Sequence, residues 1–167
     1  GPEPGRVEHC LEPLAARLVE LLQPSGRILE PSAGLGRLYC AVRAVSDCPV
    51  TLVDVSPDCC RELYATTAAD PAATLIQGDF LEMDAGRLGG QFDRIVMNPP
   101  FKMGRDVKHI THAATMLRPG GRLVTLCAAG PRQRAALEHI GQWIDLPPGT
   151  FKTEGTSVSA AIVVITR

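Results

Sequence analysis

The sequence has no excess of positive charge and no long apolar run. Its 17 Lys and Arg residues are balanced by 18 Asp and Glu residues, so the formal net charge is -1. This balance gives no overall field that would hold nucleic acid nonspecifically, and any nucleic-acid site must be a local patch. No apolar run approaches the roughly 18 residues that a membrane span needs, and no charged-then-apolar leader opens the chain. We therefore expect a cytoplasmic protein that does not bind membranes.

The six cysteines follow no disulfide or metal-binding pattern. No two of them have C-x-x-C spacing, and Cys59 is adjacent to Cys60, which favours reduced thiols. His109 and His112 are close enough on a helix to share a metal ion, but no third ligand is evident nearby. The sequence therefore predicts no metal site.

Two catalytic motifs are also missing. The chain has no G-x-S-x-G motif, which argues against covalent catalysis by a serine nucleophile. It has no Tyr-x-x-x-Lys pair, and Tyr39 stands where the dinucleotide fingerprint G-x-G-x-x-G/A requires a small residue. An NAD-dependent oxidoreductase is therefore disfavoured.

The sequence does contain an alternation of short apolar strands with helices. Parallel strands are expected at residues 27–30, 50–55, 73–77, 92–97 and 122–127, and helices at 11–22, 37–45, from 57, 106–117 and 135–143. A β-branched run at 157–165 is expected to pair antiparallel with residues near Ile144.

This alternation predicts an α/β fold, because parallel strands joined by helices form a sheet that is covered on both faces. We expect a doubly wound, Rossmann-like, mostly parallel seven-stranded sheet with an antiparallel C-terminal hairpin. Gly1 and Pro2 resemble a protease-cleavage scar. The remaining residues, 3–167, are expected to form a single domain.

In such a sheet, ligands bind beyond the carboxyl ends of the strands, where the strand order reverses. The turn from Glu30 to Gly36 contains two glycines that let the backbone approach a ligand closely. Asp54 closes the next strand and can accept both hydroxyls of a ribose. Asp79 can accept a hydrogen bond from an adenine amino group, and Phe80 can lie against the ring. Each segment is also compatible with an ordinary turn.

The acidic Glu30 narrows the choice of ligand. A carboxylate at this turn would repel a pyrophosphate, whereas it would tolerate the cationic sulfonium and ammonium of S-adenosylmethionine.

Asn98-Pro99-Pro100-Phe101 follows the fourth strand and is the most informative segment of the chain. The exocyclic nitrogen of adenine is a poor nucleophile, because its lone pair is delocalised into the ring. The Asn98 side-chain oxygen and the Pro99 carbonyl can accept its two hydrogens and direct the lone pair at a methyl donor. Phe101 offers a flat face on which an extruded base can stack.

These segments, in this order, resemble the class I S-adenosylmethionine-dependent methyltransferases, specifically the N6-adenine type with the Asn-Pro-Pro-Phe motif. The resemblance covers residues 11–127 and implies S-adenosyl-L-methionine as cofactor. The implied cofactor-binding residues are Glu30, Pro31, Ser32, Ala33, Gly34, Gly36, Asp54, Val55, Asp79, Phe80 and Asn98. The implied catalytic residues are Asn98, Pro99, Pro100 and Phe101.

The target is predicted less sharply than the chemistry. The residues expected to bind substrate are Phe101, Lys102, Arg105 and Lys152. The expected target is adenine N6 in DNA, with DNA ranked slightly above RNA. The motif is shared by enzymes that methylate guanine in RNA or glutamine amides in proteins, so these targets remain open. A catalytically idle S-adenosylmethionine-binding subunit is a further alternative.

The chain also departs from its relatives in two places. Glu12-Pro13 stands where a Thr-Pro pair often contacts the cofactor. The length of 167 residues leaves no room for a separate target-recognition region, so a protein partner could supply it.

Overall fold

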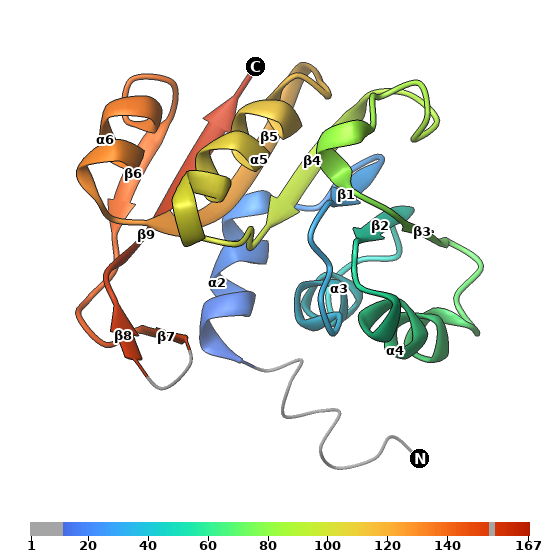
Figure 1. The fold of residues 1–167 in the computed structure, drawn as a ribbon. Coiled ribbons are helices and arrows are strands. Elements are labelled where there is room, and N and C mark those ends of the chain that lie inside the picture. The colour runs from blue at the N-terminus through green and yellow to red at the C-terminus, as the bar shows by residue number, and fades with distance from the viewer. Residues whose placement is uncertain (1–11, 154–155) are drawn as a thin grey trace.

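The computed structural model describes residues 12–153 and 156–167, and over most of its length strands alternate with helices as predicted (Figure 1). Its elements, in chain order, are α2 (Pro13–Leu22), β1 (Ile28–Glu30), α3 (Arg37–Arg43), β2 (Val50–Asp54), α4 (Pro57–Thr67), β3 (Ala73–Gln77), the 3-10 helix η1 (Phe80–Glu82), β4 (Phe92–Met97), the 3-10 helix η2 (Lys102–Gly104), α5 (Arg105–Ala114), β5 (Leu117–Ala128), α6 (Pro131–Leu137), β6 (Gln142–Asp145), β7 (Phe151–Thr153), β8 (Thr156–Val158) and β9 (Ala160–Thr166).

The central sheet has seven strands in the order β3-β2-β1-β4-β5-β9-β6. Strands β1 to β5 pair in parallel, and β9 runs antiparallel to both β5 and β6. The predicted fold class is therefore confirmed. From β1 the chain moves outward through β2 to β3 and then returns to β4 on the other side of β1, so the strand order reverses between β1 and β4. Leu29 lies opposite Ile95 in this pairing, which brings the carboxyl ends of the two strands together.

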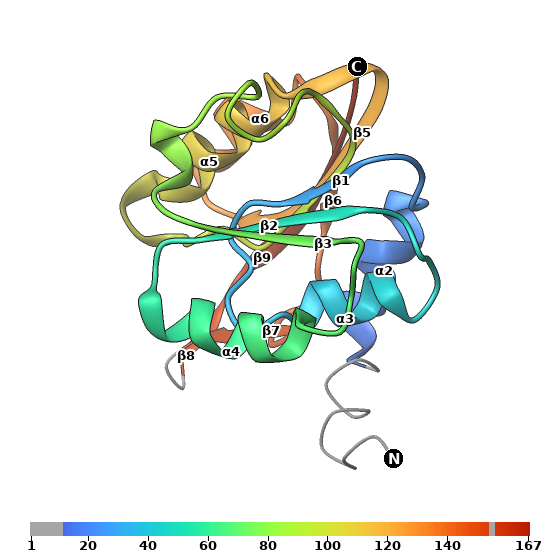
Figure 2. The same cartoon turned by 90° about the vertical axis from the view of Figure 1, so that its right-hand side faces the viewer.

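Helices cover both faces of this sheet (Figure 2). Helices α2, α3 and α4 pack on one face through apolar side chains that include Leu18, Val42 and Leu63. On the opposite face, α5 and α6 contribute Ile110 and Leu137 to a second core cluster. Burial of these clusters is the main force that holds the layers together.

Local sequence determines where α4 begins. The Ser56 side chain accepts a hydrogen bond from the Cys59 N–H at 3.2 Å, and Pro57 occupies the first helical turn. A serine cap followed by proline satisfies an otherwise free donor and preorganises the first turn. Helix α4 therefore starts immediately after the carboxyl end of β2.

The C-terminal third departs from the sequence prediction. The expected helix at residues 135–143 is wrong: α6 ends at Leu137, and Trp143 lies in β6 opposite Val163. The run expected at 157–165 is divided, since β8 pairs with β7 while β9 pairs with β5 and β6. The expected antiparallel pairing near Ile144 is confirmed, because Ile144 lies opposite Ile162. The reason is that backbone N–H and C=O groups on both sides of β9 need hydrogen-bond partners. Strand β5 supplies them on one side, and residues 142–145 supply them on the other.

The expected helix at 106–117 is also too long. Helix α5 ends at Ala114 and β5 already begins at Leu117, where it pairs with Phe92. The register of this pairing shifts between Phe92 and Arg94, and the Pro-Gly-Gly segment, with Gly120 at φ +82°, lies in the resulting bulge of β5. None of the helices in the described ranges is long and apolar enough to cross a membrane.

Candidate active site

The segments singled out in the sequence meet at one end of the sheet. The glycine turn follows β1, Asp54 ends β2, Asp79 follows β3, and Asn98 follows β4. Strand β1 lies between β2 and β4 in the sheet, so the glycine turn has Asp54 on one side and Asn98 on the other. The site therefore lies at the point where the strand order reverses, which is the usual ligand position in open α/β sheets.

Asp54 is bonded to the glycine turn. One of its carboxylate oxygens, Oδ2, accepts the Gly34 N–H at 2.8 Å, and the other, Oδ1, accepts the Ser56 N–H at 2.9 Å. Gly34 has φ +56°, and a Cβ at this position would meet nothing within 4 Å, so the turn is open on that side. Each carboxylate oxygen can accept more than one hydrogen bond. Asp54 is thus held rigidly and keeps acceptor capacity for ribose hydroxyls.

Glu30 is a buried carboxyl without a complete set of partners. Its side chain is 1% exposed, and Oε2 makes no hydrogen bond within the described residues. Burial, and next the charge of Asp54, raise the pKa of Glu30 well above its ordinary value. A buried unpaired acceptor is unfavourable, and a cation placed beside it would favour its ionised form. These properties fit a ligand with a sulfonium or ammonium group better than a pyrophosphate.

Asn98 stands at the exposed end of a buried strand. Ile95, Val96 and Met97 are 0% exposed, whereas Asn98 is exposed and its amide makes no hydrogen bond within the described part of the chain. Phe101 is partly buried and packs against the core cluster beneath α2 and α3. The amide oxygen is consequently available to an incoming donor.

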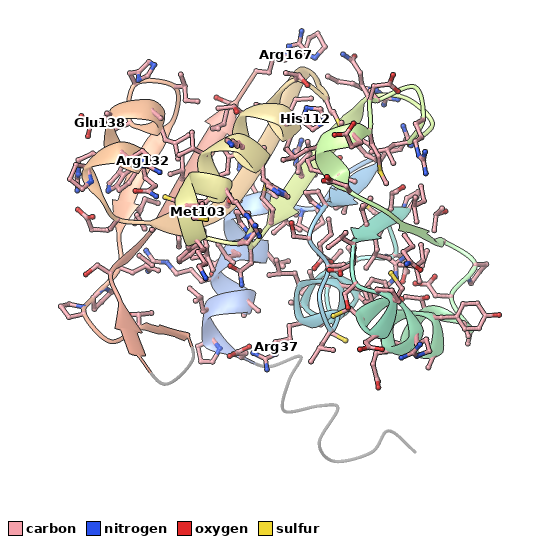
Figure 3. The ribbon with its side chains drawn as sticks, in the orientation of Figure 1. Arg37, Met103, His112, Arg132, Glu138 and Arg167 are labelled. Atoms are coloured by element: carbon pink, nitrogen blue, oxygen red, sulfur yellow. The ribbon has the colours of Figure 1, made fainter. Side chains whose placement is uncertain are left out.

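Exposed apolar side chains surround these polar groups. Leu35, Val55 and Met103 are 60%, 67% and 75% exposed, and they follow β1, β2 and β4 respectively. Met103 also adopts φ +60° and lies in η2, directly before α5 (Figure 3). Single exposed apolar residues are common, but these three follow strands β2, β1 and β4, which are neighbours in the sheet.

Not every predicted residue faces this end of the sheet. Phe80 is 2% exposed and packs in the core, with its ring centroid 4.9 Å from that of His112 in an edge-on arrangement. Asp79 caps η1 by accepting the Leu81 N–H at 3.0 Å. Phe80 therefore packs in the core next to the site, while Asp79 is exposed at the edge of the site.

The predicted substrate residues lie on separate elements. Lys102 on η2 and Arg105 on α5 are exposed directly after the Asn-Pro-Pro-Phe motif. Lys152 belongs to β7 in the hairpin that precedes β9. Because Ala160 at the start of β9 lies opposite Ala128 at the end of β5, this hairpin leaves the sheet at the same end as the site.

Sequence reasoning missed a buried acid near the motif. Asp106 is 0% exposed and accepts hydrogen bonds from the Val107 N–H at 2.9 Å, the Ala128 N–H at 3.0 Å and Gln133 Nε2 at 3.2 Å. It thereby connects α5 to the carboxyl end of β5 and to α6. An acidic residue early in a predicted helix gives no sequence signal of burial, because helix N-termini commonly carry acids at the surface.

Comparison with known proteins identifies the class of this site. Residues 10–143 match the methyltransferase small domain family. The chain belongs to this family. The predicted class, an S-adenosylmethionine-dependent methyltransferase of class I, is confirmed by this membership. The described residues contain no group of three or more His, Cys, Asp or Glu side chains placed to hold a metal ion.

Individual methyltransferases resemble the chain over different lengths. The rRNA N(6)-adenosine-methyltransferase metl-5 of Caenorhabditis elegans is 26% identical over 144 residues, which cover 78% of this chain and 66% of metl-5. The crystal structure of TrmN from Thermus thermophilus has a TM-score of 0.69 and 20% identity, with 92% of this chain and 48% of TrmN covered. The glycopeptide N-methyltransferase MtfA, complexed with S-adenosyl-L-homocysteine, has a TM-score of 0.64 and 17% identity, with 92% and 89% covered.

The chain thus spans just under two thirds of metl-5 and about half of TrmN. The structural similarity to TrmN and MtfA shows a shared fold. At such low sequence identity it does not indicate which substrate this chain binds.

Proposed function

We propose that this methyltransferase transfers the methyl group of S-adenosylmethionine to the exocyclic N6 amino group of adenine in RNA. The observation that carries the proposal is the unpaired Asn98 amide, which stands beside the turn linked to Asp54 at the reversal of strand order. The sequence by itself ranks DNA ahead of RNA. The similarity to metl-5, whose name specifies rRNA adenosine, reverses that ranking.

The cofactor side of the site comes from β1 and β2. Asp54 would accept the ribose hydroxyls, and the backbone of the glycine turn would lie along the methionine portion. Glu30 would face the positive charge, whose presence offsets the penalty of burying its carboxylate. When bound, S-adenosylmethionine supplies an activated methyl group.

The target side comes from the segment after β4. The Asn98 amide oxygen and the Pro99 carbonyl would accept the two N–H groups of the amine, so that its lone pair is directed at the methyl donor. Neither group needs to remove a proton before transfer, because the nitrogen loses its extra proton to solvent after the new N–C bond has formed. The partly exposed Phe101 would contact the extruded base.

Other planar amino groups fit the same motif. Guanine amines in RNA and glutamine amides in proteins present similar N–H pairs, and MtfA acts, by its name, on a glycopeptide. The unpaired Asn98 side-chain amide at the open end of the site argues against a catalytically idle cofactor-binding subunit, because such a subunit would bind no target amine there. A protein partner that supplies target recognition stays a prediction.

The decisive experiment is product analysis. The protein is incubated with isotope-labelled S-adenosylmethionine and, separately, with RNA and DNA oligonucleotides of one sequence and with protein extract. We expect N6-methyladenosine from RNA when the nucleosides are analysed by mass spectrometry. Label found only in methylguanine, in methylglutamine or in DNA would overturn the proposed target.

A further inference from the structure

Within the described residues, five of the eleven exposed Lys and Arg side chains have a hydrogen-bond or ion-pair partner, and those beside the candidate active site do not. Arg118 and Arg134 form ion pairs with Asp93 and Asp145, each at 3.1 Å, and Arg61 pairs with Asp58. Within the described residues, no hydrogen bond or ion pair engages the exposed side chains of Lys102, Arg105, Lys108 and Arg132. Arg17 on α2 and Arg87 in the loop between η1 and β4 also have no partner in the part of the chain that the structure describes, but they lie on other segments.

These four cations come from neighbouring elements. Lys102 is on η2, Arg105 and Lys108 are on α5, and Arg132 is in the first turn of α6. Helices α5 and α6 lie side by side on one face of the sheet (Figure 2). Because the net charge of the whole chain is -1, this group is a local positive patch within a nearly neutral molecule.

Arg132 lies directly over the segment that follows the catalytic motif. A Cβ added to Gly104 would be 2.7 Å from Arg132 Nη1 and 3.2 Å from its Cδ, so the side chain crosses the Gly104 backbone. Figure 3 shows Arg132 and Met103 at the end where α5 and α6 begin. The guanidinium therefore stands beside the exit of the Asn-Pro-Pro-Phe motif, although 34 sequence positions separate Arg132 from Asn98.

The support for Arg132 is fixed by buried hydrogen bonds. Its neighbour Gln133 donates to the fully buried Asp106, which also accepts the Ala128 N–H at the end of β5. These bonds hold the first turn of α6 against α5 and β5. A cation on such a support loses less conformational freedom on binding than one on a free loop.

We propose that Arg132, together with Lys102 and Arg105, binds the phosphates that flank the target adenine of a single-stranded RNA, an inference that rests on the proposed function. A base that enters the site must leave its stack, so the adjoining backbone has to cross the rim beside η2 and α6. The planar guanidinium of Arg132 matches two phosphate oxygens at once. Phosphate contacts hold the strand in register and leave the chemical step to Asn98.

The test compares Arg132→Ala with Arg87→Ala, a matched control in the segment that leads into the amino end of β4. Binding of a fluorescent single-stranded RNA oligonucleotide is measured by anisotropy at several salt concentrations. We expect the Kd of Arg132→Ala to rise about 3- to 10-fold and the slope of log K against log salt to shrink by about 0.7, the effect of one lost phosphate contact. Arg87→Ala should bind as the wild type does.

Two further measurements distinguish a loss of RNA binding from a loss of cofactor binding or of catalysis. Affinity for S-adenosylmethionine and the turnover at saturating RNA should be unchanged in Arg132→Ala, while KM rises. Should Arg132→Ala fail to fold, Lys102→Ala applies the same test from η2. Wild-type RNA affinity and salt slope in a folded variant would overturn this inference, whereas failure of the proposed function would appear as absence of N6-methyladenosine in the wild type.

Discussion

The raised pKa of Glu30 couples the stability of the protein to pH. Its raised pKa means that ionisation of this buried carboxyl destabilises the native state, so stability is greatest below the ordinary value of 4.5 and declines as pH rises through the higher native-state pKa. A bound cation would reverse this effect by stabilising the carboxylate. Cofactor binding should therefore release a proton from Glu30 at pH values below its native pKa.

The substitution Glu30→Gln tests this linkage, because it keeps the shape of the side chain and removes the titration. We expect wild-type affinity for S-adenosylmethionine to increase as pH rises from about 5 to about 8, and the variant to bind about tenfold more weakly at the upper end. Calorimetry in buffers of different ionisation enthalpy measures both affinity and proton release. Parallel pH profiles for the two proteins would show that Glu30 does not face the cofactor charge.

The family resemblance places Asn98 among both the cofactor-binding and the catalytic residues, and we expect its side-chain amide to act on the transition state. Asn98→Ala should lower turnover by about 100-fold or more, the usual effect of losing one preorganised polar contact, while cofactor affinity stays unchanged. Single-turnover kinetics and calorimetry separate the two quantities. A folded variant with wild-type turnover would leave the motif with a structural role alone.

At the residue scale, the sequence identifies those candidate site residues whose position depends only on the neighbouring strand. Asp54 and Asn98 could be found because each directly ends or follows an apolar strand, and such positions collect at one end of a parallel sheet. Phe80 follows the same rule, but it begins η1 and its side chain is buried in the core. Asp106 and Arg132 could not be found, because their roles depend on contacts between α5 and α6 that no local pattern encodes.

At the element scale, a polar cluster anchors α3, the helix that follows the glycine turn. Asp70, in the loop before β3, accepts hydrogen bonds from the Tyr39 hydroxyl and from Arg43 Nε, the latter at 2.7 Å. The Arg43 guanidinium also lies 5.4 Å from the centroid of the Tyr39 ring. The bulky Tyr39, which argues against a dinucleotide, is thus the residue through which α3 is attached to the edge of the sheet.

The substitution Asp70→Asn should weaken this attachment by about 1–2 kcal/mol near neutral pH, because charged hydrogen bonds are lost from a mostly buried site. The hydrogen bond from Arg43 is the main cause that lowers the pKa of Asp70 below its ordinary value of 3.8. A lowered carboxyl pKa stabilises the native state above the ordinary value, and this contribution is lost as pH falls through the native-state value.

Urea unfolding of the wild type and Asp70→Asn measures the difference directly. The difference in free energy of unfolding should be present at pH 7 and should shrink as pH falls below 3.8. An equal difference at both ends of this range would indicate a packing effect and no contribution from charge.

The elements that were predicted incorrectly share a physical cause. Residues 135–143 have helical composition, yet a Cβ at Gly141 would lie 2.7 Å from the Val164 carbonyl oxygen, so the chain passes very close to β9 there. Pairing with β9 then determines the conformation of β6. Backbone hydrogen bonding between distant segments outweighs intrinsic propensity, which differs by only about 1 kcal/mol per residue.

At the scale of the whole molecule, the alternation of strands and helices was sufficient to predict the layered sheet. Parallel pairing requires crossovers, and the right-handed crossover rule leaves few arrangements for such a chain. The polymer that carries the target amine follows from no such rule, because RNA, DNA and protein amines present the same planar group to Asn98.

A ligand that binds only the native state must stabilise the entire domain. At 100 times its Kd, S-adenosylmethionine should add about 2.7 kcal/mol and raise Tm by about 5–10 °C for a domain of this size. NAD at the same concentration is the control and should leave Tm unchanged. Stabilisation by NAD and not by S-adenosylmethionine, in a thermal melt, would contradict the proposed cofactor.

The pairing of β1 with β4 has a consequence for how the protein is made. The Arg27 N–H donates to the Asp93 carboxylate at 2.8 Å across 66 sequence positions. Strand β1, which ends at Glu30, therefore pairs with a strand that is synthesised much later, β4, which precedes Asn98. Contacts between residues so far apart in the sequence form slowly, because closing the intervening loop costs conformational entropy. A nascent chain that ends before residue 92 would contain the glycine turn and Asp54 but would lack the strand β4 beside them. Methyl transfer can therefore begin only after the second half of the sheet has been synthesised and has joined the first.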